Sequence, residues 1–247
     1  MSRPSLSQTR RHPGRIAAIR IVPAALAAVL ALGGIAAANG VDDFRARGNE
    51  PFWSLTKSAD AITFQPMDGP AVTVAPVPRP AIEGGAEVYR GSAGGAPFVL
   101  TVADAVCTDT MSGMPFPATV SVAIGADTFE GCGGEPVALL LGDWTITAID
   151  GAAPIAGTEP ALAFAEEGKL SGAASCNRFF GGYTLTGEGL SIGALGASMM
   201  ACEEPVMAQE RAVTEILEGV TNFAIAEDGS LVLTAADGRT ITARRAS

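Results

Sequence analysis

The sequence predicts a mainly β protein of the α+β class, made of two small antiparallel β domains, the second with one amphipathic helix packed on a curved sheet. Three observations support this fold class. Short β-branched or alternating runs recur along the chain, turn dipeptides separate them at hairpin spacing, and a single segment shows helical periodicity. The 247 residues, 48% of them apolar and 17% charged, are long and apolar enough for one or two ordered domains.

Residues 39–141 are expected to form the first domain. Its strands should be short, with glycine-containing turns between them. The expected strands are 61–64, 71–74, 88–89, 97–102 and 118–124, with turns at 68–69, 84–85 and 94–95. Pro76, Pro78 and Pro80 place their stretch at an edge or in a loop, because proline cannot donate to a sheet ladder.

Residues 142–247 are expected to form the second domain, after a boundary within residues 135–142. Strands are predicted at 144–149 and 183–185, and a three-stranded meander at 223–226, 231–235 and 240–243. One helix is expected from Pro205 to Val220, since its apolar residues recur at helical spacing. Its polar face is acidic, which favours packing on the sheet over binding to an anionic membrane.

Residues 1–38 resemble an export signal. A basic segment ends at Arg20, an apolar run follows, and the small residues before Ala38 fit a cleavage site. The sequence therefore predicts a periplasmic protein cleaved after Ala38. The alternative is an uncleaved inner-membrane anchor over residues 21–38. No cysteine lies near the cleavage site, which argues against a lipid anchor.

The four cysteines fall into two local pairs, one in each half. Cys107 is followed by Cys132, and Cys176 by Cys202. Four cysteines allow three connectivities, and the local one is favoured because it keeps each bridge within one expected domain. A metal or redox site is the competing interpretation, but the chain has no C-x-x-C motif and no nearby histidine.

Composition excludes several classes of function. The first 38 residues hold five of the 16 basic residues and none of the 26 acidic ones, so the remainder is strongly acidic and poorly suited to bind nucleic acid. His12 is the only histidine, which excludes histidine-dependent catalysis and histidine-ligated zinc from the part after the signal. We expect no cofactor and no metal.

The second half carries a specific motif. Its segments 142–146, 170–183 and 198–202, including Ser171-Gly172 and Cys176-Asn177, closely resemble the META domain of the HslJ heat-shock family. The first half, with Gly48 to Trp53 and Cys107 to Gly113, resembles an uncharacterised bacterial envelope module found beside META domains. The resemblance implies a β-rich fold around one helix, an exported setting, links to heat shock and novobiocin resistance, and no established enzymatic activity. Many members of the family are lipoproteins, whereas this chain lacks a lipidation cysteine.

Candidate binding residues come from the same motifs. Asn177, Arg178 and Tyr183 are predicted to line a ligand pocket, in which arginine could clamp a carboxylate. Their structural interpretation is a turn at Asn177 that bonds local amides, followed by Phe179, Phe180 and Tyr183 as aromatic core. Glu50 and Trp53 are candidates for a recognition loop, or else Phe52 and Trp53 pack in the core as a strand begins.

Catalytic interpretations are weaker. Asp109 to Gly113 superficially resembles an aspartic-protease motif, but extra residues interrupt it and no second copy exists. Neither Ser112 nor Ser175 has the spacing to Lys57 or Lys169 that a serine–lysine mechanism requires, and there is no phosphate-binding loop. The leading prediction is a non-catalytic envelope stress or homeostasis protein that binds a protein, peptide or lipid. The alternatives are a lipid-carrying pilot or assembly factor and a carboxylate-based hydrolase.

Overall fold

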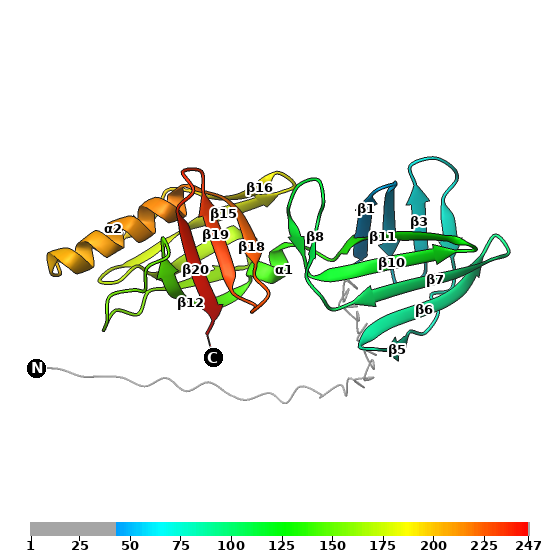
Figure 1. Ribbon diagram of the computed structural model, residues 1–247, viewed down its shortest axis with the longest axis horizontal. Coiled ribbons are helices and arrows are strands. Elements are labelled where there is room, and N and C mark those ends of the chain that lie inside the picture. Colours follow the sequence, from blue (N-terminus) through cyan, green and yellow to red (C-terminus); the bar gives the residue numbers. More distant parts are fainter. Residues whose placement is uncertain (1–42, 247) are drawn as a thin grey trace, which may run out of the picture. The chain divides into compact units, whose positions relative to one another are not determined.

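Two curled antiparallel sheets and a long helix dominate the computed structural model, which describes residues 43–246 (Figure 1). The predicted export signal and its cleavage site lie outside the described residues. Those residues belong to one compact unit, residues 40–247. Neither helix within residues 43–246 has both the length and the apolar character that crossing a bilayer requires.

The first sheet has nine antiparallel strands in the order β4-β3-β2-β1-β11-β10-β7-β6-β5. Strand β4 also lies against β6, so the sheet curls. The proline stretch lies in the loop between β4 and β5, as predicted. The strands are β1 (Phe44–Asn49), β2 (Phe52–Lys57), β3 (Ile62–Pro66), β4 (Val72–Val74), β5 (Ala81–Glu83), β6 (Ala86–Ala93), β7 (Ala96–Ala103), β10 (Ala118–Ile124) and β11 (Asp127–Gly133).

The second sheet runs in the order β16-β15-β14-β13-β12-β20-β19-β18, and its end strands β16 and β18 contact each other. The predicted meander is present as β18, β19 and β20. The strands are β12 (Gly142–Ile149), β13 (Ala161–Ala165), β14 (Lys169–Ala173), β15 (Arg178–Thr186), β16 (Gly189–Ile192), β18 (Val220–Ile225), β19 (Leu231–Ala235) and β20 (Thr240–Arg245), and the short β17 (Gly196–Ala197) pairs with β15.

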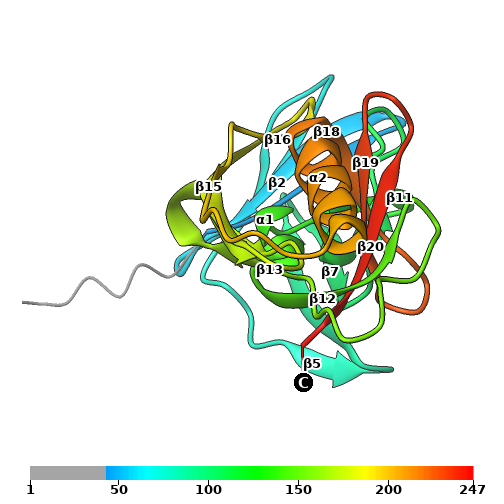
Figure 2. The ribbon, with the colours of Figure 1, turned by 90° about the vertical axis from the view of Figure 1, so that its left-hand side faces the viewer.

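Helix α2 (Glu204–Glu218) packs on this sheet, against β16, β19 and β20 (Figures 1 and 2). It buries Val213, Ile216 and Leu217, the apolar stripe that the sequence predicts. The helix ends at Glu218 and not at Val220, because Gly219 terminates it and Val220 begins β18. The apolar residues that precede the second sheet form the short helix α1 (Val137–Leu140).

The two hydrophobic cores are unequal. The first lies within the first sheet and includes Trp53, Phe64 and Leu100. The second fills the other sheet and also takes in Met114 and Phe116, which belong to a loop of the first half. This loop includes two short paired strands, β8 (Cys107–Thr108) and β9 (Pro115–Phe116), and Phe116 lies on β9. The division into two domains stays a prediction, but the second core plainly draws on residues from before the expected boundary.

Both expected cysteine pairs are at disulfide distance, Cys107 with Cys132 and Cys176 with Cys202. Their Cα atoms lie 5.4 Å and 6.3 Å apart. Each bridge therefore ties a loop to a segment of the same half of the chain.

The prediction of a packed aromatic core is wrong at two positions. Phe52 and Phe180 are 45% and 66% exposed, whereas their neighbours Trp53 and Phe179 are buried. Successive residues of a strand point to opposite faces, so two adjacent aromatic residues cannot both face the same core.

Candidate binding site

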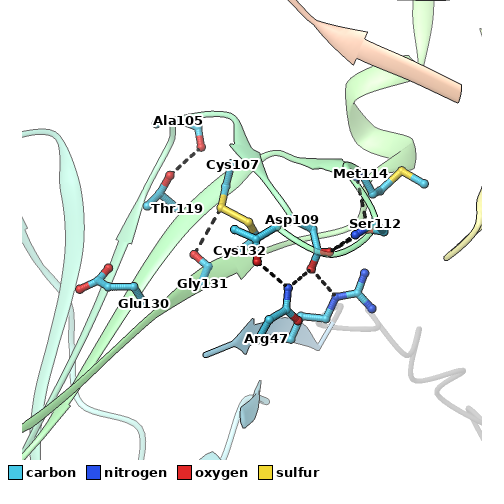
Figure 3. The surroundings of a disulfide bond; sticks show 12 residues. Arg47, Ala105, Cys107, Asp109, Ser112, Met114, Thr119, Glu130, Gly131 and Cys132 are labelled. Carbon is cyan, nitrogen blue, oxygen red and sulfur yellow. Dashed lines mark hydrogen bonds and ion pairs between the residues drawn. A yellow bond between two sulfur atoms is a disulfide. The ribbon is translucent and has the colours of Figure 1, made fainter. Parts of the chain in front are cut away.

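A buried carboxylate organises the loop beside the first disulfide. Asp109 is 6% exposed, and its Oδ1 accepts hydrogen bonds from the Met111 amide at 3.1 Å and from the Ser112 amide and hydroxyl, both at 2.8 Å (Figure 3). Its Oδ2 accepts a bond of 3.1 Å from Asn49 Nδ2 on β1. Side chains from both sides thus hold this carboxylate, and the loop closes around it.

These bonds set the protonation of Asp109. Burial alone would raise its pKa, but the hydrogen bonds from Ser112, Asn49 and Met111 outweigh burial and lower the pKa to about 2. Asp109 is therefore ionised at neutral pH, and its oxygens are occupied. It has the properties of a structural carboxylate and lacks the raised pKa of a general acid.

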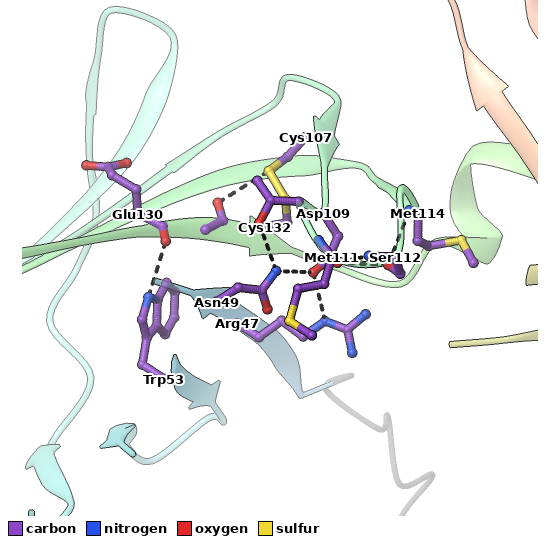
Figure 4. Close-up of polar contacts among 12 residues, drawn as sticks. Arg47, Asn49, Trp53, Cys107, Asp109, Met111, Ser112, Met114, Glu130 and Cys132 are labelled. Carbon is purple, nitrogen blue, oxygen red and sulfur yellow. Dashed lines mark hydrogen bonds and ion pairs between the residues drawn. A yellow bond between two sulfur atoms is a disulfide. The ribbon is translucent and has the colours of Figure 1, made fainter. Parts of the chain in front are cut away.

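Two side chains that follow Asp109 in the sequence pack in the second hydrophobic core. The Cys107–Cys132 bridge lies at the base of the Asp109 loop, and Asn49 bonds Asp109 and Thr110 in it (Figure 4). The side chains that follow, Met114 and Phe116, are 5% and 6% exposed. Arg47 lies with its guanidinium 4.7 Å from the centre of the Phe116 ring and its Nε 3.8 Å from Asp109 Oδ2. The loop thereby fixes both an aromatic ring and an arginine at one place.

A groove of about 930 Å³ begins at this arginine. One wall is the outer face of β1 and β2, and the opposite wall is β15 with the turn η1 (Glu166–Gly168). We call the apolar side chains that line the groove its floor; they include Phe116, Val137 and Leu141, and Leu185 of β15. The volume lies within the range of ligand-binding clefts.

The two walls of the groove carry opposite charges, and one further exposed acidic residue, Glu135, also lines the groove. Arg45 and Arg47 project from β1 beside Thr56 and Ser54, their respective partners on β2. Glu166 and Glu167 line the other wall. Within residues 43–246, Arg45 and Glu166 form none of the salt bridges. The groove thus offers an exposed cation and an exposed anion across an apolar floor.

Tyr183 holds the acidic wall in place. Its ring is 7% exposed and packs edge-on against Phe164, with centroids 5.2 Å apart, and its hydroxyl donates to the Ala165 carbonyl at 2.9 Å. The next turn also lies on Tyr183, since a Cβ on Gly168 would come within 2.6 Å of the Tyr183 carbonyl oxygen. Glu167 and Gly168 both have positive φ, of 59° and 69°. Burial raises the pKa of Tyr183, which keeps its hydroxyl a donor.

A smaller hollow of about 300 Å³ lies at the other side of Arg47, where Glu50 and Glu130 line it. Trp53 is buried beneath it, and its Nε1 donates to the Glu130 carbonyl at 3.2 Å (Figure 4). Gly48 stands opposite Trp53 in the sheet, where a Cβ would come within 2.7 Å of the indole Cε2. In Gly48 to Trp53, glycine therefore makes room for tryptophan, and Glu50 remains exposed.

Asn177 lies in a separate network beside the second disulfide. It is 2% exposed, and its Oδ1 accepts hydrogen bonds from the Ser198 hydroxyl and the Met200 amide, both at 2.7 Å. Its Nδ2 donates to Glu210 Oε1 at 2.9 Å. The chain does turn at 174–177, between antiparallel β14 and β15, as expected. The expected local amide bonds are wrong, because the partners of the Asn177 side chain are more than twenty residues away, and Asn177 lacks positive φ. Its neighbour Arg178 is exposed.

The chain was compared with protein families, solved structures and curated proteins. The META domain family matches residues 137–247, from the start of α1 to the end of the chain. Residues 137–247 therefore belong to the META domain family. A solved structure, the NMR structure of a protein from Burkholderia xenovorans, is 30% identical, covers 46% of this chain and 89% of its own, and has a TM-score of 0.38. Comparison with curated proteins finds no match.

The five predicted binding residues do not share one pocket. Tyr183 of the META domain lines the groove, Glu50 lines the smaller hollow, and Trp53 lies buried under it. Asn177 and Arg178 line neither hollow. Sequence reasoning missed Arg45, Arg47 and Glu166. Arginines at alternate positions on β1 were the available signal, but their counterpart lies more than a hundred residues away on the META domain.

Metal ligation has no geometric support in residues 43–246. Within them, no three histidine, cysteine or carboxylate side chains converge as a metal site requires. The chemistry that the groove offers is ion pairing, hydrogen bonding from hydroxyls and apolar contact.

Proposed function

We propose that this chain is a non-catalytic envelope protein of the META type, with a role in stress or homeostasis, that holds a partner protein, peptide or lipid in the groove. The groove itself carries the proposal. It is large enough for a ligand, it has an apolar floor from Phe116 to Leu185, and it presents exposed charges that are free to pair with a ligand.

The ionisable groups support binding over catalysis. A general acid in hydrolysis needs a carboxyl group with a raised pKa. Within residues 43–246, every carboxylate whose pKa is displaced has a lowered pKa. These are Asp109, through the bonds described above, and the exposed Glu83, Asp228 and Asp237, through bonds with Arg90, Ser230 and Arg239. This pattern favours a binding protein over the carboxylate-based hydrolase.

The disulfides support an oxidising compartment. Two bridges are compatible with the bacterial envelope, where disulfides persist. Together with the signal-like residues 1–38, they lead us to propose a periplasmic location and cleavage after Ala38. Mass spectrometry of the protein from a periplasmic extract tests this, because the cleaved chain must begin at Asn39 and contain no free thiol. A chain that retains residues 21–38 in the inner-membrane fraction would favour the anchor.

Site-specific photocrosslinking tests the groove. A benzoylphenylalanine at Thr56, on the cationic wall, is expected to capture a discrete partner in living cells. The matched control is Thr73, an exposed threonine of β4 that does not line the groove. Adducts at Thr56 and none at Thr73 are expected. Equal labelling at the two positions, or none at Thr56, would refute a binding role for the groove.

A further inference from the structure

We propose that the occupant of the groove is an extended polypeptide segment that places a carboxylate on the β1 arginines and a cationic side chain on Glu166. This inference rests on the proposed function and names the class of partner. It follows from the separation of charge between the two walls.

The cationic wall is built to receive an anion. Arg45 and Arg47 are two residues apart on one strand, so both point to the same face, where Thr56 and Ser54 stand opposite them. Arg47 is held from behind, with Asp109 at its Nε and Phe116 under its guanidinium plane. No hydrogen bond from its terminal nitrogens occurs within residues 43–246. Two guanidinium groups beside two hydroxyls suit a carboxylate.

The acidic wall excludes a simple anionic ligand. Glu166 and Glu167 lie on a turn that Tyr183 fixes, and Glu167 is only paired with the exposed Lys169 at 2.6 Å. Such a surface pair stabilises little. Glu166 forms none of the salt bridges within residues 43–246, so its charge stays available to a ligand. An anionic lipid would pair with Arg45 but leave Glu166 facing its headgroup or its apolar tail.

A polypeptide satisfies both walls at once. It supplies acidic and basic side chains, apolar side chains for the floor, and backbone groups for the hydroxyls of Ser54, Thr56 and Thr184 that line the groove. The chain as a whole has a net charge of −10, which further disfavours docking on anionic membranes. Charge complementarity therefore selects a peptide with both signs of charge.

The test begins with a phage-displayed library of random dodecapeptides. The library is selected against the purified protein, expressed from the full sequence and processed by the host. Peptides that carry both an acidic and a basic residue around apolar ones are expected to be enriched. The affinity of one enriched peptide, made synthetically with a fluorophore, should fall at least about tenfold in Arg45→Glu and in Glu166→Lys. The matched control is Arg244→Glu, an exposed arginine of β20 that lies outside the groove.

Charge reversal gives the decisive readout. The double variant Arg45→Glu/Glu166→Lys should bind a peptide whose acidic and basic residues have been exchanged, and should bind the original peptide poorly. Equal affinity of the wild type and both single variants for the peptide would overturn the inference, as would failure of the exchanged peptide to bind the double variant. Melting curves of all variants confirm that each is folded.

Vesicles of phosphatidylglycerol separate the lipid alternative. If the protein binds them, and binding is lost in Arg45→Glu but retained in Glu166→Lys, the occupant is an anionic lipid and the inference is wrong. If no peptide is enriched while Thr56 still yields crosslinks, the inference fails and the proposed function stands. If Thr56 yields none either, both fail.

Discussion

Two disulfides of this protein each lie beside a buried carboxylate, and the two arrangements differ in reach. Asp109 binds amides two and three residues ahead of it in its own loop. Glu210 stands on α2 and accepts bonds from the Cys176 and Asn177 amides, at 3.2 Å and 2.7 Å, across more than thirty residues. The first carboxylate shapes its own loop and has one bond to β1, from Asn49, whereas the second has both of these loop amides bonded across to a helix. The same chemistry thus serves mainly loop closure in one half and tertiary packing in the other.

Removal of the second disulfide is expected to have the largest effect. Cys176→Ser with Cys202→Ser should lower the free energy of unfolding by about 3 kcal/mol, because the denatured chain gains loop entropy. The neighbouring exposed residue gives the control, since Arg178→Ala should cost less than about 0.5 kcal/mol. Urea unfolding followed by tryptophan fluorescence measures both. Equal losses would contradict the assignment of Arg178 to the surface.

Loss of the Glu210 carboxylate is expected to have the second largest effect on stability. Glu210→Ala leaves the Cys176 and Asn177 amides without their acceptor and removes one of the two bonds of Asn177 Nδ2, which keeps the Met200 carbonyl; this should cost about 2 to 3 kcal/mol in the same assay. Glu215→Ala, on an exposed face of the same helix, is the matched control and should change stability by less than about 0.5 kcal/mol. If the two variants unfold alike, Glu210 does not hold the loop to α2.

The contribution of Asp109 should be visible in the pH dependence of the free energy of unfolding. The pKa of Asp109 is about 2 in the folded protein and about 3.9 in the unfolded chain. Its stabilisation is therefore complete above the unfolded pKa and is lost as pH falls toward 2. Between about pH 6 and pH 2.5, Asp109 should account for about 1.5 kcal/mol of lost stability. In Asp109→Asn this contribution should vanish. An unchanged pH profile in the variant would show that Asp109 is not held as described.

The smallest expected effect concerns the groove. Tyr183→Phe removes the bond to the Ala165 carbonyl and should cost about 1 kcal/mol of stability. If Tyr183 positions the acidic turn, the variant should also bind the enriched peptide more weakly, whereas Tyr89→Phe in the first sheet should not. Fluorescence anisotropy measures the binding. Unchanged affinity in Tyr183→Phe would limit Tyr183 to a role in the core.

The same contrast between local and distant contacts explains what the sequence could predict. Turn dipeptides, the helix and the cysteine pairs depend on neighbours along the chain, and these expectations agree with the structure. The positions of Phe52 and Phe180 required knowledge of which face of a strand is buried. The partners of Asn177, and the meeting of Arg45 with Glu166 in one groove, depend on the packing of distant segments, which no local pattern records.

The placement of Met114 and Phe116 in the second core affects how the chain is assembled. Translation delivers these side chains well before β20, the last strand of the core that receives them. Until the C-terminal segment has been synthesised, the core that buries these two side chains is incomplete. Complete burial of these first-half side chains therefore depends on the second half having folded. A META domain exchanged from another protein would need a core surface that fits Met114 and Phe116.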